Sequence, residues 1–233
     1  MRRSAESTTF ASLWVFPGGT IRTDDLKLAE HEEHTSLSAA AAHLALARTP
    51  DVPPEAPEES LAYFVCAARE LFEEAGVLLT RPLPAASQLA DLRTRVQSGL
   101  SLATAAEELG AALALDELTF YGHWITPLPA PARFDTRFFL ALLPEGQEAT
   151  PDAHEVLDGQ WLSPDQALAE GRAGRLPLHF ATLNHLKRLG PYPTCGELLA
   201  FARAKPIAPV LPNWREENGR IIPSLPLELQ DAW

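Results

Sequence analysis

Apolar and polar positions recur with helical spacing in one stretch around which the chain is organised, residues 62–76. Ala68, Leu71 and Ala75 stand at i, i+3 and i+7, which is the apolar stripe of a helix that packs on a core. Gly76 follows where a helix commonly ends in a left-handed residue. The pattern therefore predicts a helix over 62–76 with one face buried.

Three acidic residues of the same stretch fall on a different face of that helix. Glu70, Glu73 and Glu74 stand at i, i+3 and i+4, so their Cβ atoms would lie about 5–6 Å apart. Like charges at that spacing destabilise a helix unless a cation lies among them. Arg69 stands four residues before Glu73 and can orient its carboxylate.

The rest of the chain alternates between apolar runs typical of strands and amphipathic stretches typical of helices. Strands are predicted at 20–22, 77–79, 118–125 and 134–143, with a turn and strand at 155–162. The apolar run 10–16 is predicted to be a strand or an extended approach to one. Helices are predicted at 36–48, 85–96, 102–113, 178–189 and 194–203, and another begins at Pro164 after the capping residue Ser163. The capping-box pattern at 104–107 gives an alternative start for the helix at 102–113. The tail from Pro206 is predicted to be irregular. This order of elements predicts an α/β or α+β layered domain with a mixed sheet.

The composition is that of one sizeable globular domain. The chain has 233 residues, of which 46% are hydrophobic, and we expect a single domain over 1–233. Within it, 26–60 is predicted to be an insertion that ends in a Pro/Glu-rich exposed linker at 49–59. Residues 85–115 form a helical segment and 186–233 a C-terminal extension.

The charge and the cysteines limit the classes of function. A net charge of −12 argues against general binding to nucleic acid or to an anionic membrane. No apolar run approaches the roughly 20 residues of a membrane span, and the N-terminus lacks the apolar core of a signal peptide. Cys66 and Cys195 are expected to be reduced thiols of a cytoplasmic protein. His31, His34 and His43 are expected to be surface residues, since their spacing is not that of a metal site.

Clustered carboxylates are hard oxygen ligands, which suit Mg²⁺ or Mn²⁺ better than zinc. An acidic helix face by itself is more often simply solvated. Here an apolar run and the turn Pro17-Gly18-Gly19 precede the helix, and paired glycines let a backbone approach another group closely.

These residues together resemble the Nudix hydrolase family. Residues 69–77 match the second half of its sequence box, Arg-Glu-U-x-Glu-Glu-x-Gly-U with U aliphatic, and Gly19 matches the opening glycine. Asp25 stands where the box has glutamate. An uninterrupted box would place its arginine at position 33 rather than 69, so 36 additional residues lie inside it. Only 16 residues precede the Pro-Gly-Gly turn, so either the start is shorter than in relatives or the sheet is completed otherwise, for example in a homodimer.

The interrupted box is similar to that of the Nudix coenzyme A diphosphatases that carry a long insertion. The resemblance covers roughly residues 10–200 and rests on 66–82, 133–139 and 155–164. It implies a Nudix α/β/α sandwich that hydrolyses coenzyme A or acyl-coenzyme A to 3′,5′-ADP and (acyl-)4′-phosphopantetheine. Alternative nucleoside-diphosphate substrates are ADP-ribose, NADH and dinucleoside polyphosphates. An alternative of another class is a catalytically silent module that senses a nucleotide.

The resemblance also implies roles for individual residues. The Mg²⁺ or Mn²⁺ ligands would be Glu70, Glu73, Glu74 and the carbonyl of Gly18. The catalytic residues would be Arg69, Glu70, Glu74 and Glu155. The substrate-binding residues would be Arg133, Phe134, Arg137 and Phe16. The alternative role of Glu155 is that of an exposed loop carboxylate. The alternative for Arg133 and Arg137 is a surface ion pair, and the alternative for Phe16 is core packing.

Overall fold

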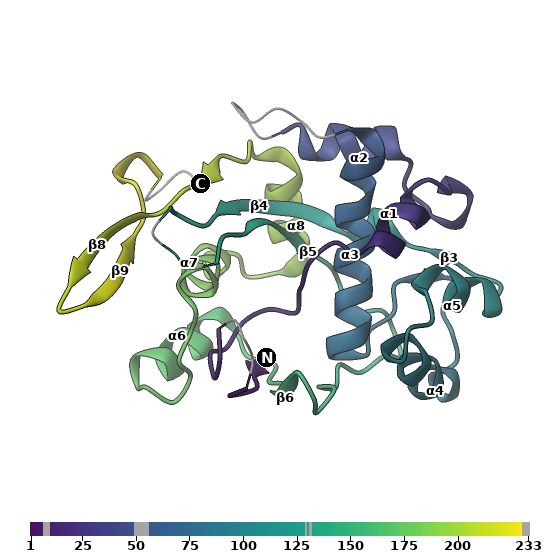
Figure 1. The fold of residues 1–233 in the computed structure, drawn as a ribbon, viewed down its shortest axis with the longest axis horizontal. Coiled ribbons are helices and arrows are strands. Elements are labelled where there is room, and N and C mark those ends of the chain that lie inside the picture. The colour runs from purple at the N-terminus through teal and green to yellow at the C-terminus, as the bar shows by residue number, and fades with distance from the viewer. Residues whose placement is uncertain (7–9, 49–55, 129, 131, 230–233) are drawn as a thin grey trace.

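The fold is organised around α3 (Pro57–Ala75), a 19-residue helix that crosses one face of a β-sheet in the computed structural model (Figure 1). The structure describes residues 1–6, 10–48, 56–128, 130 and 132–229. Pro57 stands at the start of α3, acidic residues fill its first turn, and Gly76 ends it at φ 70°. The helix is thus longer than predicted, and the end of the predicted linker belongs to it. Residues 49–55 of that linker lie outside the described residues.

The central sheet is mixed, as predicted. Within the described residues its strand order is β5 (Asp135–Leu140), β4 (Thr119–Ile125) and β7 (Pro209–Val210). β4 pairs with β5 antiparallel and with β7 parallel. β5 is shorter than the predicted strand 134–143, and β7 lies in the tail that was predicted to be irregular.

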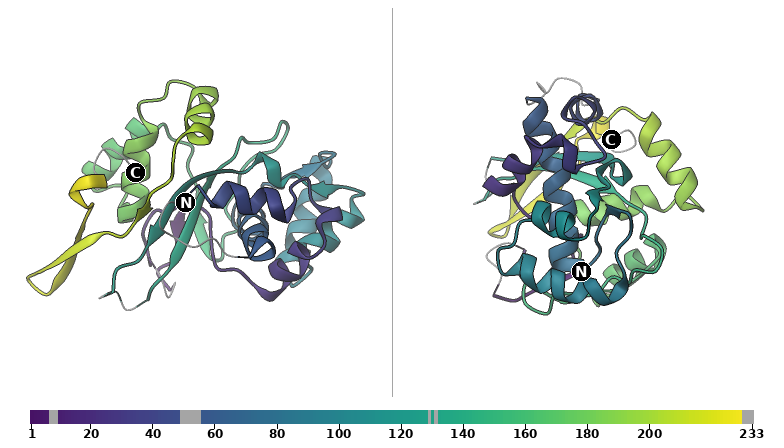
Figure 2. Two further views of the ribbon diagram at one scale, coloured as in Figure 1. Left: turned by 90° about the horizontal axis from the view of Figure 1, so that it is seen from above. Right: turned by 90° about the vertical axis from the view of Figure 1, so that its right-hand side faces the viewer.

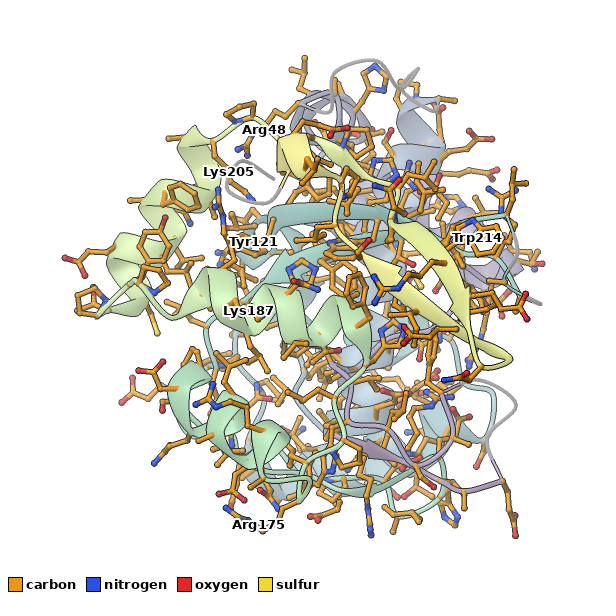
Figure 3. All side chains as sticks on the ribbon, turned by 90° about the vertical axis from the view of Figure 1, so that its left-hand side faces the viewer. Arg48, Tyr121, Arg175, Lys187, Lys205 and Trp214 are labelled. Carbon is orange, nitrogen blue, oxygen red and sulfur yellow. The ribbon has the colours of Figure 1, made fainter. Side chains whose placement is uncertain are left out.

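Helices cover both faces of this sheet, which confirms the predicted layered sandwich (Figures 1 and 2). On one face the rings of Phe64 from α3 and Phe139 from β5 lie 4.7 Å apart. On the other face His185 of α7 (Phe180–Leu189) lies 4.1 Å from the ring of Phe138. The helix α8 (Cys195–Ala204) follows on the same side, where Lys205 Nζ lies 4.2 Å from the ring centre of Tyr121 (Figure 3).

The insertion 26–60 is more helical than predicted. It contains most of α1 (Thr23–Ala29), the 3-10 turn η1 (Glu32–His34), α2 (Ala39–Leu46) and the first turn of α3. α2 is shorter than the predicted helix 36–48 because the Ser38 side chain accepts a hydrogen bond from the Ala41 amide and so caps the helix there. Buried side chains of α1 and α2 join the core cluster of α3, so the insertion is part of the packed structure.

The segment 85–115 contains α4 (Ala86–Gln97) and α5 (Leu102–Glu108), followed by β3 (Ala112–Leu113). The predicted helix 102–113 is therefore wrong beyond Glu108. Gly110 lies at φ 62°, which ends the helix and lets the chain turn into the strand. After it come the 3-10 turn η2 (Leu115–Glu117) and β4.

The predicted strand 77–79 is also wrong. The backbone N–H and C=O of Leu78 bond instead to the side-chain amide of Gln147. The strand starts later, as β2 (Thr80–Arg81), which pairs with β3.

The strand predicted at 20–22 is not formed. Of the two alternatives for 10–16, a strand or an extended approach to one, the strand is not formed either. Phe10 and Ser12 lie at positive φ, which interrupts an extended run, and Trp14 makes isolated bridges instead. A strand that was not predicted, β1 (Arg2–Arg3), pairs with β6 (Val156–Asp158), which is shorter than the strand expected at 155–162. The helix α6 (Pro164–Arg172) begins after the capping residue Ser163, as predicted.

The tail contains a hairpin of β8 (Asn213–Glu217) and β9 (Arg220–Ser224), followed by the 3-10 turn η3 (Leu227–Leu229). Its turn residues Asn218 and Gly219 both lie at positive φ, as tight hairpin turns require. The hairpin extends from the body of the molecule and carries the half-exposed Trp214 (Figures 1 and 3). Among the described residues, no helix combines the length and the apolar character needed to cross a membrane.

Candidate active site

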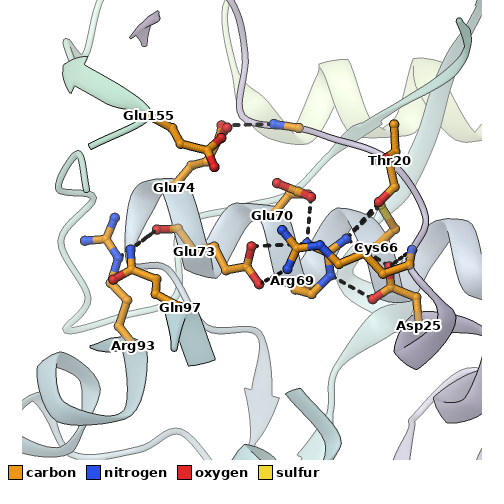
Figure 4. A network of polar contacts seen from close by, with 12 residues as sticks. Thr20, Asp25, Cys66, Arg69, Glu70, Glu73, Glu74, Arg93, Gln97 and Glu155 are labelled. Atoms are coloured by element: carbon orange, nitrogen blue, oxygen red, sulfur yellow. Dashed lines mark hydrogen bonds and ion pairs between the residues drawn. The ribbon is translucent and has the colours of Figure 1, made fainter. Parts of the chain in front are cut away.

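The three carboxylates of α3 are buried, so they are not a solvated helix face. The exposed fractions of Glu70, Glu73 and Glu74 are 6%, 9% and 3%. Figure 4 shows them along one side of the helix, with the Arg69 guanidinium beside the first two. Burial of charge at this density requires cations or strong hydrogen bonds, because isolated buried charges are very costly.

Arg69 supplies one such cation. Its Nη1 lies 2.6 Å from Glu70 Oε1 and 3.1 Å from Glu73 Oε2. Its Nε and Nη2 donate to the two oxygens of Asp25 at 2.8 and 2.9 Å, and Nη2 donates to the Thr20 carbonyl at 3.0 Å. Burial alone would lower the Arg69 pKa, but the Asp25 hydrogen bonds and the neighbouring carboxylates raise it. Asp25, which departs from the Nudix box, therefore reaches Arg69 despite its shorter side chain.

The Pro-Gly-Gly turn lies directly against the carboxylates. The Gly18 N–H donates to Glu74 Oε2 at 3.1 Å. A Cβ atom added at Gly19 would lie 2.3 Å from Glu70 Oε1, so any side chain there would displace that carboxylate. Glycine at position 19 therefore lets the turn approach Glu70 while the Glu70 carboxylate keeps its place.

Two residues outside the box complete this side of the site. Arg3 Nη1 lies 2.9 Å from Glu74 Oε1, and its Nη2 lies 3.8 Å from Glu155 Oε2. Glu155 stands beside Glu74 in Figure 4, and its side chain is 65% exposed. The sequence prediction included Glu155 but missed Arg3, because nothing near position 3 resembles a motif.

Helix α4 supports the end of α3 that carries Glu73. Arg93 Nε and Gln97 Nε2 donate to the Glu73 carbonyl at 3.0 and 2.9 Å (Figure 4). Arg22, at the start of α1, lies 2.9 Å from the Glu73 side chain. Sequence reasoning missed these three residues as well, although the four-residue spacing of Arg93 and Gln97 places them on one helix face.

The electrostatics of the site favour a further cation. Burial raises the pKa of Glu74 to about 7 against the hydrogen bond from Gly18 and the charge of Arg3, and burial also raises the pKa of Glu70. The donors are carboxylate oxygens and a glycine backbone, which is the ligand chemistry of Mg²⁺ and Mn²⁺. The residues thus fit such an ion by chemistry. Among the described residues, however, no three acidic, histidine or cysteine side chains converge as a ready ligand set, because the arginines hold the carboxylates.

The two phenylalanines predicted to bind substrate, Phe16 and Phe134, each contact a different aromatic ring. Phe16, two residues before Gly18, is 37% exposed, and its ring lies 6.3 Å from that of His185. The ring of Phe134 lies 6.1 Å from that of Phe10. Substrate binding by either phenylalanine remains a prediction.

The two arginines of β5 and its approach contact the sheet and α3. The Arg137 guanidinium lies 4.4 Å from the ring centre of Tyr63 and 2.5 Å from Asp135, and its side chain is 3% exposed. Arg133 Nε donates to the Thr126 carbonyl at 3.1 Å. The contacts found for these arginines are structural, and their role in binding a phosphate remains a prediction.

Comparison with known proteins agrees with the geometry of α3. The family model described as "NUDT19 Nudix domain" matches residues 1–189. "Acyl-coenzyme A diphosphatase NUDT19" of Homo sapiens is 32% identical over 160 residues, which cover 61% of this chain and 43% of that protein. The protein of the same name from Gallus gallus is 27% identical over 242 residues, which cover 87% and 63%. The chain thus spans less than two thirds of the length of these curated relatives.

A solved structure gives the same result for the fold. The crystal structure of a Nudix hydrolase from Alicyclobacillus acidocaldarius superposes with a TM-score of 0.66 and 26% sequence identity, over 85% of each chain. The family match covers most of the chain, and it includes both the glycine turn and the carboxylate helix. The chain therefore belongs to the Nudix hydrolase family, in the group defined by the NUDT19 Nudix domain.

Proposed function

We propose that this protein hydrolyses the diphosphate linkage of coenzyme A or acyl-coenzyme A to 3′,5′-ADP and (acyl-)4′-phosphopantetheine. The observation that carries the proposal is the buried row Glu70, Glu73 and Glu74 beside the glycine turn, in a chain that matches the NUDT19 Nudix domain. The choice of coenzyme A among nucleoside diphosphates rests on the names of the relatives and on the interrupted box.

Glu70, Glu73, Glu74 and the Gly18 carbonyl would hold the divalent ion, Mg²⁺ or Mn²⁺. Such an ion supplies charge neutralisation on the diphosphate oxygens and lowers the pKa of a bound water. The protein supplies the arrangement of the carboxylates. Arg69, fixed by Asp25, positions Glu70 and Glu73, while the Gly18 amide positions Glu74.

Glu155 is the residue we assign to proton transfer. It lies near Glu74 through the shared contact with Arg3, and its exposed side chain can move toward a water molecule. A carboxylate that accepts the proton of the attacking water accelerates hydrolysis as a general base. The Glu155 backbone carbonyl accepts a hydrogen bond from the Ser4 amide at 2.9 Å, which anchors the loop that carries it.

Competing functions remain within and outside the enzyme class. ADP-ribose, NADH and dinucleoside polyphosphates contain the same diphosphate group, and a silent sensor would bind a nucleotide without cleaving it. The retained carboxylates favour an enzyme, because a sensor has no need of three buried acids. We further propose that the protein is cytoplasmic, that residues 1–233 form one domain, and that it has no nucleic-acid or membrane partner. That it forms a homodimer stays a prediction.

A substrate panel tests the proposal. The protein is incubated with Mg²⁺ and, separately, coenzyme A, an acyl-coenzyme A, ADP-ribose, NADH and a diadenosine polyphosphate, and the products are separated by chromatography. We expect 3′,5′-ADP to form fastest from the coenzyme A substrates. Faster cleavage of ADP-ribose would overturn the substrate assignment alone, whereas binding of a nucleotide without any cleavage would support the sensor.

A further inference from the structure

Arg3 makes a contact in the site that no sequence motif accounts for. Its side chain is 15% exposed, and Nη1 lies 2.9 Å from Oε1 of Glu74, whose side chain is 3% exposed. The same guanidinium lies 3.8 Å from Glu155. One cation therefore stands between the most buried acid of α3 and the carboxylate to which we assign proton transfer.

Backbone pairing fixes Arg3 in this position. β1 pairs with β6 so that Arg3 lies opposite Val156, the residue after Glu155. The Arg3 amide donates to the Leu13 carbonyl at 3.1 Å, and the Met1 ammonium donates to the Val15 carbonyl at 2.7 Å. The backbone of Arg3 is thus held on two sides, and the strand pairing that positions Arg3 also positions Glu155.

The other arginines of the site are held differently. Arg69 is anchored by Asp25 and by the Thr20 carbonyl, on the side away from the carboxylates of α3. Arg22 contacts Glu73 from a side chain that is 53% exposed, where water weakens an ion pair. The Arg3 side chain is itself 15% exposed, and it pairs with the buried Glu74 from β1, an element separate from α3.

We propose that Arg3 is a built-in counter-ion of Glu74, which a divalent ion must displace in order to use that carboxylate as a ligand. The inference rests on the proposed function, because it takes Glu74 as a metal ligand. Arg3 is then a positioning residue: it holds the Glu74 carboxylate in place before the metal arrives, and it limits the affinity for the metal.

The test is Mn²⁺ affinity, measured by calorimetry at pH 8.5 on wild type, Arg3→Met and Arg3→Lys. Arg3→Met loses the competing positive charge, so we expect it to bind Mn²⁺ about tenfold more tightly than wild type. A tenfold change is a modest share of the interaction energy between unit charges a few ångströms apart near a protein surface. Arg3→Lys keeps the charge and is expected to bind Mn²⁺ close to the wild-type affinity.

A matched control removes the general effect of net charge. Arg81→Met loses the same charge at a residue that pairs with Asp116 and Glu117, and it is expected to bind Mn²⁺ as wild type does. Equal or weaker Mn²⁺ binding by Arg3→Met, with wild type still binding, would overturn the inference and leave the proposed function intact. No Mn²⁺ binding by wild type would overturn the proposed metal site and the inference with it.

A measurement on the wild-type protein covers the case in which Arg3→Met does not fold. The guanidinium NMR signal of Arg3, assigned by its absence from Arg3→Lys, is expected to shift when Mg²⁺ saturates the protein, because the ion pair with Glu74 is broken. An Arg3 signal that stays unchanged at saturation would show that the metal does not displace the arginine.

Discussion

Asp25 and Arg69 form a bidentate ion pair at the centre of the site, with Nε and Nη2 of the arginine 2.8 and 2.9 Å from the two carboxylate oxygens. They are 44 residues apart in sequence, and the insertion lies between them. Asp25 also accepts a hydrogen bond from the Arg22 amide at 2.8 Å and so caps α1. One carboxylate thus joins the start of the insertion to the helix that carries the acidic residues.

Asp25→Asn is expected to destabilise the protein by about 3 kcal/mol, the lower end for breaking a buried ion pair, because Glu70 and Glu73 still balance Arg69. Urea unfolding of wild type and variant measures this loss. Asp24→Asn is the matched control: that side chain is 61% exposed and pairs with Lys27, so a change within about 0.5 kcal/mol is expected. Equal stability of the two variants would show that the ion pair does not join the insertion to α3.

Gly19→Ala is expected to weaken Mn²⁺ binding about tenfold, the scale seen when groups that orient metal ligands are changed. The added Cβ would lie 2.3 Å from Glu70 Oε1, and the flexible carboxylate can move away at little cost to folding. Calorimetric titration measures the affinity, and thermal unfolding checks the fold. Gly18→Ala is the comparison, because its Cβ would meet no atom within 4 Å, so it should keep more of the affinity than Gly19→Ala. The reverse order would contradict the assignment of Glu70.

The stability of the protein is expected to fall as the pH drops below about 6.5, in part because of His185. Burial, and then the charge of Lys205, lower the pKa of this histidine to about 3 from an ordinary value of 6.5. Between these values the unfolded chain binds a proton that the native protein does not, so acid favours unfolding by up to about 1.4 kcal/mol per pH unit.

Urea unfolding between pH 7 and pH 5 measures this effect. His185→Leu should reduce the dependence of the unfolding free energy on pH, whereas the same substitution at the largely exposed His31 should leave it as in wild type. An unchanged slope in His185→Leu would show that His185 does not stay neutral in the folded protein.

Sequence reasoning reached the carboxylate helix because its evidence is local. The spacing of Glu70, Glu73 and Glu74, and the glycines at 18, 19 and 76, impose their constraints within a few residues. The layered fold was predictable from the order of helices and strands, because most of these elements have a local sequence pattern. The structure adds that the acids are buried and that Gly19 lies against Glu70.

What the sequence did not reveal depends on contacts between distant residues. Arg3 is placed by a strand pairing with residues more than 150 positions away, and Arg93 by the packing of α4 on α3. The hairpin at Asn218-Gly219 had a local signal, but the prolines around it favoured an irregular tail. The run 10–16 is apolar enough for a strand, yet positive φ at Phe10 and Ser12 interrupts it.

The most direct test of catalysis by the α3 carboxylates is the rate of coenzyme A hydrolysis with Mg²⁺ by wild type, Glu74→Gln and Glu58→Gln. Glu58 is an exposed residue in the first turn of the same helix, so its variant controls for the loss of one charge on α3. We expect Glu58→Gln to match wild type and Glu74→Gln to lose at least about 100-fold in kcat, the scale of losing one essential group. Equal rates for wild type and Glu74→Gln would contradict the account.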